Sequence, residues 1–264
     1  CMRCGRSGPS RSPSACWPIV PETGVPRGVH ARHAPLLSAA ETLHIARAFL
    51  PERAWGNRRD YYYGRSKLRH DPLFEGVLHW LPDDDRPVLD IGCGLGLLAH
   101  VLRQRQRRGS YTGVDVDAGK VLRARRAALR GTLPQVRFDA VDARTGLPAH
   151  QGHVVLLDVL QYLDPAPQRA LLEAASARVA PGGRLLLRTP LATGDRRDHT
   201  TRIADRLAWL TGWMGTRPRH YPRAAVLEDD LASAGLGVHT PRPLHGRTPF
   251  NSWLLVAERP AAQD

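Results

Sequence analysis

The sequence contains few residues that could form disulfides or bind a metal. Four cysteines occur in 264 residues, and three of them lie in the first 35 residues, where no second Cys or His pair follows at zinc-finger spacing. The fourth, Cys93, stands inside a glycine-rich turn. A domain of more than about 150 residues buries enough surface to fold without such cross-links. We therefore expect no disulfide framework and no metal site.

Long apolar runs are also missing. No stretch approaches the roughly 18 consecutive apolar residues that cross a membrane as a helix. No apolar segment typical of a secretory signal occurs before residue 35. The expectation is a cytoplasmic protein without a membrane span.

Lysine is scarce in a chain whose formal net charge is +13. Lys67 and Lys120 are the only lysines among 38 basic residues, so arginine carries nearly all of the positive charge. A basic surface could bind nucleic acid, an acidic membrane or an acidic protein partner. Alternatively, arginine spread through an alanine-rich chain could reflect a GC-rich genome. Both interpretations remain open at this stage.

The chain divides into three parts by composition and apolar periodicity. Residues 1–35 are rich in Gly, Pro, Ser and Arg and have no apolar period, which predicts a disordered leader. Residues 36–85 read as a helical lead-in with helices over 36–50 and 59–80. Residues 86–260 form the predicted main domain, in which strand-like and helical segments alternate.

The order of these segments predicts the fold class. Strands are expected at 87–91, 110–114, 135–138, 154–157 and 184–187, and helices at 97–107, 118–130 and 167–179. Helices at 198–213 and 223–234 and strands at 237–241 and 252–257 follow. Strands that alternate with helices indicate right-handed crossovers. We predict an α/β, Rossmann-like, mostly parallel sheet with helices on both faces and a terminal antiparallel strand.

A glycine-rich turn follows the first predicted strand and opens a helix. Gly92, Gly94 and Gly96 let the backbone approach a ligand without a Cβ clash. Asp115 ends the second strand, 23 residues after Gly92, where a carboxylate can accept hydrogen bonds from ribose hydroxyls. Asp90 would be unfavourable beside a pyrophosphate but suits a ligand with an ammonium and a sulfonium. The pattern favours S-adenosylmethionine over NAD, and an NAD-binding or non-catalytic Rossmann protein is the alternative.

Five segments resemble the motifs of class I S-adenosylmethionine-dependent methyltransferases. Val88–Gly96 resembles their motif I, and Gly113–Asp117 looks like the acidic motif of their second strand. The other three matches are 140–143 after strand three, 155–163 at strand four, and the Pro-Gly-Gly turn within 179–187. On these segments the chain is identified as a member of that family.

The resemblance implies S-adenosylmethionine as cofactor and assigns residues to it. The methionine part would lie against the glycine turn and Asp90. Asp115 would hold the ribose, Val116 the adenine face, and Asp142 with Ala143 the adenine edge. Asp158 would lie near the methyl donor. Two alternatives stay open, because Asp142 could cap a turn and Asp158 could cap a helix.

The sequence favours a small-molecule or carrier-bound acceptor, methylated at oxygen. An Asn- or Asp-Pro-Pro-aromatic run after strand four and a well-placed catalytic cysteine are both missing, which makes nucleic acid a weaker candidate, although an RNA methyltransferase remains the alternative. Residues 61–72 resemble methyltransferases encoded with bacterial aryl-polyene pigment synthases, which would imply an aromatic polyene on an acyl carrier protein. Tyr62 and Arg65 are expected in the acceptor pocket, and His199 is the candidate base unless catalysis needs no protein base.

Overall fold

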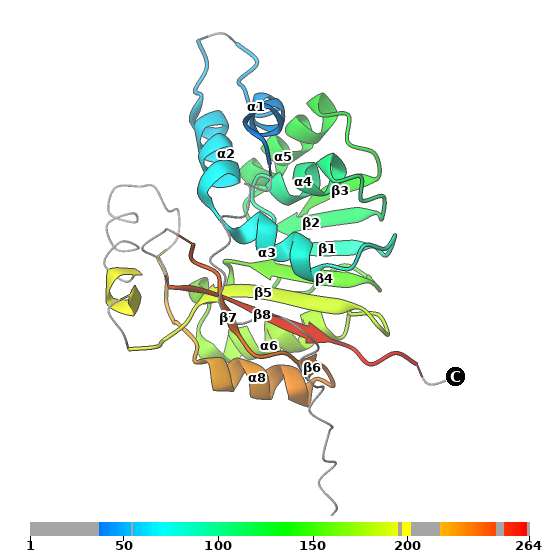
Figure 1. Cartoon of the computed structure of the whole chain (residues 1–264), viewed down its shortest axis with the longest axis vertical. Coiled ribbons are helices and arrows are strands. Elements are labelled where there is room, and N and C mark those ends of the chain that lie inside the picture. The colour runs from blue at the N-terminus through cyan, green and yellow to red at the C-terminus, as the bar shows by residue number, and fades with distance from the viewer. Residues whose placement is uncertain (1–36, 54, 195–196, 202–216, 247–250, 263–264) are drawn as a thin grey trace, which may run out of the picture. The chain divides into compact units, whose positions relative to one another are not determined.

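A mixed sheet runs through the described part of the chain (Figure 1). The computed structural model describes residues 37–53, 55–194, 197–201, 217–246 and 251–262. The strand order is β3-β2-β1-β4-β5-β8-β6, and β7 also pairs with β8. The first five strands are parallel to one another, whereas β8 runs antiparallel to β5 and β6. The predicted fold class is confirmed.

Strands and helices occupy the following ranges. The strands are β1 (Val88–Ile91), β2 (Tyr111–Asp115), β3 (Val136–Ala140), β4 (His153–Leu157), β5 (Arg184–Pro190), β6 (Gly237–Val238), β7 (Arg242–Pro243) and β8 (Ser252–Glu258). The helices are α1 (Ala39–Arg47), α2 (Arg59–His70), α3 (Leu73–Trp80), α4 (Leu97–Gln104), α5 (Ala118–Arg130), α6 (Pro165–Ser176) and α8 (Ala224–Ser233), with a 3-10 turn η1 (Leu160–Tyr162). None of these helices is both long and apolar enough to cross a bilayer.

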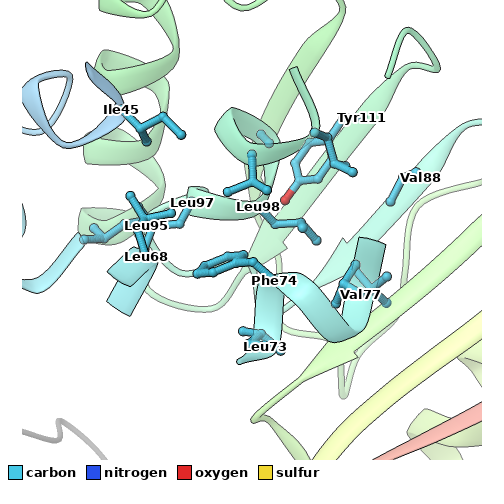
Figure 2. Close-up of a cluster of buried hydrophobic side chains, with 14 of the residues drawn as sticks. Ile45, Leu68, Leu73, Phe74, Val77, Val88, Leu95, Leu97, Leu98 and Tyr111 are labelled. Carbon is cyan, nitrogen blue, oxygen red and sulfur yellow. The ribbon is translucent and has the colours of Figure 1, made fainter. Parts of the chain in front are cut away.

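Two apolar layers cover the two faces of the sheet. Val88 packs with residues of α1 to α5 on one face, where Phe74 and Leu98 also lie (Figure 2). Leu89 and Ile91 point to the other face and pack with α6 and α8. Successive residues of a strand face opposite sides, so a strand buried on both faces is apolar throughout. This arrangement leaves the carboxyl edge of the parallel strands as the place where polar side chains gather.

The lead-in helices differ from their prediction at one point. A single helix over 59–80 is wrong, because α2 and α3 are separated at Asp71-Pro72. Proline disfavours a helical conformation in the preceding residue, and Asp71 accordingly has φ −87° and ψ 120°. Its Oδ1 accepts a hydrogen bond from the Leu73 amide at 3.0 Å, which starts α3 in a new direction.

Other predicted boundaries shift by a few residues. The predicted helix over 36–50 is shorter, since Ser38 and Glu41 form a capping box that starts α1 at Ala39. The strand expected over 184–187 extends to Pro190, and the two-residue β7 was not predicted. The antiparallel pairing of the last two predicted strands is confirmed by β6 and β8. Of the helix expected over 198–213, residues 198–201 are helical and 202–213 lie outside the described residues.

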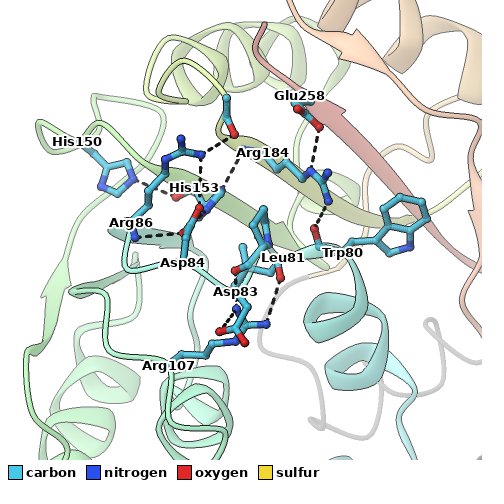
Figure 3. Close-up of polar contacts among 12 residues, drawn as sticks. Trp80, Leu81, Asp83, Asp84, Arg86, Arg107, His150, His153, Arg184 and Glu258 are labelled. Carbon is cyan, nitrogen blue, oxygen red and sulfur yellow. Dashed lines mark hydrogen bonds and ion pairs between the residues drawn. The ribbon is translucent and has the colours of Figure 1, made fainter. Parts of the chain in front are cut away.

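Polar contacts hold the amino edge of the sheet together (Figure 3). The His153 ring lies between Asp84, at 3.0 Å from its Oδ1, and the Arg184 amide, which donates to Nδ1 at 3.0 Å. The Arg184 side chain donates to Glu258 at 3.0 Å and to the Trp80 carbonyl at 2.8 Å. Burial lowers the pKa of His153 despite the Asp84 carboxylate. These groups serve the fold and lie away from the glycine turn.

Two further guanidiniums close loops by donating to backbone carbonyls. Arg178 donates to the carbonyls of Leu147, Pro148 and Ala174 at 2.7–2.8 Å. Arg259 donates to those of Ser176 and Val179 at 2.7 and 2.8 Å. Both side chains therefore tie the end of α6 to neighbouring segments.

Candidate functional site

The glycine turn follows β1 and leads into α4. Gly92, Gly94 and Gly96 all have positive φ, at +79°, +56° and +74°, which favours glycine at each position. A Cβ at Gly92 would lie 2.2 Å from Val159 Cγ2, and one at Gly96 would lie 2.5 Å from Phe138 Cζ. A Cβ at Gly94 would meet nothing within 4 Å. Packing alone therefore explains two of the glycines, and Gly94 is the one that borders open space.

Asp115 at the end of β2 connects the second strand to this turn. Its Oδ2 accepts a hydrogen bond from the Gly94 amide and its Oδ1 accepts one from the Asp117 amide, both at 2.9 Å. Each carboxylate oxygen keeps a free lone pair, so the group can still accept from two hydroxyls. The next residue, Val116, is 68% exposed. At the carboxyl edge, a carboxylate that can accept hydrogen bonds from two hydroxyls thus lies next to an exposed apolar side chain.

Asp90 is enclosed beneath the turn. It is 2% exposed, its Oδ2 accepts a hydrogen bond from the Tyr111 hydroxyl, and its Oδ1 has no partner among the described residues. Burial raises the pKa of Asp90 to about 7, and the charge of Asp115 acts in the same direction, whereas the Tyr111 bond and Lys67 oppose the shift. A buried acceptor without a donor fits the approach of a cationic group. The residues around the turn therefore fit a ligand with a diol, an apolar ring and a positive charge.

Asp142 follows β3 and has partners of its own. Its carboxylate accepts from the Arg144 amide at 3.0 Å and from the Arg144 guanidinium at 2.6 Å. These bonds lower the pKa of Asp142. The turn-capping role that the sequence left open is present in the structure, and Ala143 packs on the apolar layer beside it. A role for Asp142 and Ala143 at an adenine edge stays a prediction.

Four charged side chains meet at the end of β4, beside Arg188 of β5, and we call them the Lys67–Arg188 cluster (Lys67, Asp71, Asp158 and Arg188). Asp158 has a positive φ of +60° and lies 3.4 Å from both Lys67 Nζ and Arg188 Nε. Asp71 accepts a hydrogen bond from Arg188 Nη1 at 2.7 Å and lies 3.6 Å from Lys67. Asp158 does not cap α6, whose N-cap residue is Asp164. The helix-cap interpretation of Asp158 is therefore wrong for α6.

Both cations of this cluster stay charged. Burial lowers the pKa of Lys67, but Tyr63, Asp158 and Asp71 outweigh it and raise that pKa above its usual value. The pKa of Arg188 is raised in the same way by the two aspartates, although only 5% of its side chain is exposed. Neither group can therefore act as a base near neutral pH, and the cluster offers N–H donors and carboxylate acceptors at the sheet edge.

The predicted acceptor residues lie on exposed surface. Tyr62 is 56% exposed and contacts Tyr61 edge to face, so the run of tyrosines is not simply core packing. Arg65 is exposed on the same helix that carries Lys67. His199 is exposed in the helical segment 197–201, after the buried Asp198. The structure thus places Tyr62 and Arg65 on one helix with Lys67, and it gives no contact that joins His199 to them.

The sequence prediction missed Lys67, Asp71 and Arg188. Arg188 had a visible signal, since a charged residue stands inside the apolar run of β5. Lys67 had a weaker one as one of only two lysines. The partners of each could not be read from the chain, because 117 residues separate Asp71 from Arg188.

Comparison with known sequences places this site in a family. A family model described as a methyltransferase domain matches residues 63–240, which is more than half of the chain. The carboxy-S-adenosyl-L-methionine synthase of Chromohalobacter salexigens is 34% identical over 185 residues, which is 63% of each chain. The trans-aconitate 2-methyltransferase of Sinorhizobium medicae is 28% identical over 51% of each. The chain therefore covers less than two thirds of the length of these relatives.

Solved structures share the fold. The magnesium protoporphyrin IX methyltransferase of Synechocystis PCC 6803, solved with bound SAH, superposes with a TM-score of 0.57 at 20% identity, covering 82% of this chain and 92% of that one. An O-methyltransferase family protein of Burkholderia thailandensis gives a TM-score of 0.56 at 22% identity, with 85% and 69% covered. At such identities the likeness concerns the fold.

Proposed function

Since the chain belongs to the family of S-adenosylmethionine-dependent methyltransferases, we propose that it transfers a methyl group to an oxygen of a small-molecule or carrier-bound acceptor. The observation that carries the proposal is the pairing of Gly94 with Asp115, which leaves one open glycine beside a carboxylate with free lone pairs. S-adenosylmethionine brings an activated methyl group on its sulfonium, so the protein need not supply a nucleophile.

The residues of the turn would hold this cofactor in a defined order. We assign the methionine part to Asp90, Gly92, Gly94 and Gly96, and the ribose to Asp115. Val116 would contact the adenine face, with Asp142 and Ala143 at its edge. The partnerless Oδ1 of Asp90 supports the assignment of the cationic end, because an ammonium would satisfy it.

The acceptor would lie over the carboxyl edge between α2 and the ends of β4 and β5. Asp158 belongs to the Lys67–Arg188 cluster and follows β4, the strand next to β1, so it stands close to the glycine turn. Tyr62 and Arg65 on α2 would contact the acceptor, and His199 would take its proton if a protein base is used. The protein's main contribution is alignment of donor and acceptor at near-attack distance without water between them.

A matched pair of variants tests the cofactor assignment. Asp115→Asn should weaken the binding of S-adenosylhomocysteine by roughly tenfold or more, because the amide offers one acceptor oxygen in place of two. Asp117→Asn removes the same charge two residues away and keeps an N-cap for α5, so it should change the affinity little. Isothermal calorimetry measures both. Tight NAD binding without a response to S-adenosylhomocysteine would refute the assignment.

The acceptor class is tested by methyl transfer. Labelled S-adenosylmethionine is offered with phenolic small molecules, an aryl-loaded acyl carrier protein and total RNA. We expect label in the first or second pool, with a mass increase of one CH₂, and loss of that label in Asp115→Asn. Label in RNA alone would replace the proposed acceptor with a nucleic acid.

A further inference from the structure

A cavity lies at the edge of the sheet opposite the glycine turn. Its volume is about 910 Å³, within the range of sites for small organic ligands. α1 and the C-terminal parts of α4 and α5 form its wall with the loops that precede β2 and β3. The lining residues are His44, Ile45, Arg47, Ala48, His100, Arg103, Gln104, Gln106, Arg107, Arg108 and 130–135, and we call this space the arginine cavity.

The charge of the arginine cavity is positive and largely uncompensated. Five arginines line it, and no Asp or Glu does. Arg107 is paired with Asp83 at 2.7 Å (Figure 3), and Arg130 lies 3.8 Å from Glu52. Arg103 instead donates to four backbone carbonyls, and no carboxylate contacts it in the described part of the chain.

The two remaining arginines are available to a ligand. Arg47 and Arg108 are exposed, and no described residue forms an ion pair or a hydrogen bond with either guanidinium. Together with Arg103 they leave about three positive charges beside one concave space. Such a field attracts an anion with more than one negative charge.

A buried ring in the same wall lacks a partner. His100 is 4% exposed and packs on Phe49 at 5.1 Å between ring centroids, and its Nε2 has no hydrogen-bond partner among the described residues. This nitrogen is enclosed by protein atoms, so the ring forms part of the wall and does not itself offer a polar group to the space.

Three residues with a left-handed backbone border this space. Gln106, Thr132 and Gln135 have φ of +58°, +49° and +52°, and only one other described residue that is not glycine has a positive φ. The conformation is especially unfavourable for Thr132, whose side chain is β-branched. Gln106 and Thr132 follow the C-cap residues of α4 and α5, and the next amides, of Arg107 and Leu133, donate to the Leu102 and Ala128 carbonyls at 3.0 Å, so helix termination accounts for these two conformations.

We propose that the arginine cavity binds a small organic phosphate, separately from the cofactor. A phosphate monoester carries about two negative charges near neutral pH, which matches Arg47, Arg103 and Arg108 better than a single carboxylate would. Guanidiniums bind phosphate oxygens through paired N–H groups, which Arg47 and Arg108 can offer, whereas Arg103 contributes its charge and keeps its N–H groups on backbone carbonyls. Ile45 and Leu133 border the same space and would contact the organic part.

Calorimetry on the full chain saturated with S-adenosylhomocysteine tests the proposal, because the cofactor site is then filled. Phenyl phosphate is the probe, inorganic phosphate is the anion without the ring, and phenol is the ring without the anion. We expect phenyl phosphate to bind, inorganic phosphate to bind more weakly, and phenol not to bind. Arg47→Gln and Arg108→Gln should each raise the dissociation constant of phenyl phosphate roughly tenfold.

Arg169→Gln on α6 is the matched control, because it removes one exposed guanidinium outside the cavity. This variant should change the dissociation constant of phenyl phosphate by no more than about twofold, since a distant exposed charge is screened. Absence of phenyl phosphate binding at millimolar concentration, or an equal loss in Arg169→Gln, would overturn the proposal. An oligoribonucleotide that binds over a hundredfold more tightly than phenyl phosphate through Arg47 and Arg108 would also overturn it, in favour of a polynucleotide.

Discussion

At the scale of single residues, the Asp90–Tyr111 pair combines a buried carboxyl with a hydroxyl donor. Because burial raises the pKa of Asp90 to about 7 from an ordinary value near 3.8, the folded state holds its proton more tightly than the unfolded state. The stabilising contribution of that proton is complete below about pH 4 and is lost as the pH rises through 7.

Asp90→Asn should therefore gain stability relative to the wild type as the pH rises. We expect a relative gain in the free energy of unfolding of roughly 2–4 kcal/mol between pH 5 and pH 8, because the amide cannot ionise and can still accept from Tyr111. Urea unfolding at several pH values measures this. Asp139→Asn is the control, because the carboxyl of Asp139 on β3 is paired with Arg125 and Arg137. A constant difference between Asp90→Asn and wild type across this range would contradict the assignment.

Tyr62→Ala and Arg65→Ala should lower methyl transfer without lowering cofactor affinity. Tyr62 and Arg65 are exposed on α2, so their truncation creates no cavity in the core. Loss of an acceptor contact should reduce kcat/KM by roughly tenfold. Arg126→Ala on α5 is the control for the loss of an exposed arginine. Equal losses of turnover, S-adenosylhomocysteine affinity and stability would instead indicate a folding defect.

The sequence predicted the positions of those candidate site residues that depend on local chain geometry. Gly92, Gly94 and Asp115 lie at the carboxyl edge as expected, because strand ends and the glycine turn are read over short distances. The bond between Asp90 and Tyr111 depends on the register of β1 against β2, and the contact of Asp71 with Arg188 depends on how α2 packs. Such long-range pairings leave no periodic signal in the chain.

At the scale of elements, the junction of α2 and α3 depends on Asp71. Its carboxylate accepts a hydrogen bond from the Leu73 amide and another from the buried Arg188 guanidinium. The sequence prediction treated residues 59–80 as one helical stretch. Pro72 ends that helix, and the i,i+4 spacing along α2 brings Lys67 and Asp71 together at the sheet edge.

Asp71→Ala should destabilise the chain by roughly 2–4 kcal/mol, because it removes the acceptor of the Leu73 amide and leaves a buried guanidinium with fewer partners. Asp71→Asn should lose less, since the amide can still accept from Leu73. Asp164→Ala is a matched control at the start of α6, because its pair with Arg219 is exposed on both sides. That change should cost at most about 1 kcal/mol. Chemical unfolding of the three variants checks the order, and equal losses in Asp71→Ala and Asp164→Ala would refute it.

At the scale of the whole molecule, the family, fold class and cofactor predicted from the sequence are confirmed by the family model over residues 63–240, the strand order of the sheet and the fold shared with a methyltransferase solved with bound SAH. The acceptor could not be predicted in the same way. It depends on the lead-in helices, the Lys67–Arg188 cluster and the segment after β5, which come together only in the folded chain.

A chain that begins at Pro35 should keep the fold and the cofactor site. The first 35 residues lack an apolar period, and residues 35–264 form a compact unit of their own. We expect the shortened chain to unfold cooperatively at the same temperature within a few degrees and to bind S-adenosylhomocysteine with unchanged affinity. Differential scanning calorimetry and a binding titration measure these two properties. A broad melt would show that residues 1–34, which this chain lacks, are structural.

The contacts of Arg178 and Arg259 bear on how the charge of this protein can be altered. Their guanidiniums reach several carbonyls at once, a geometry that the three N–H donors of lysine on a single nitrogen cannot reproduce. Part of the net positive charge therefore belongs to arginines that the loops need for their structure, independently of any ligand that the surface binds. Charge-reversal libraries and arginine-directed reagents such as phenylglyoxal would disrupt these loops as well as the surface. Mapping a binding face on this molecule should accordingly target only arginines whose side chains hold no backbone carbonyl.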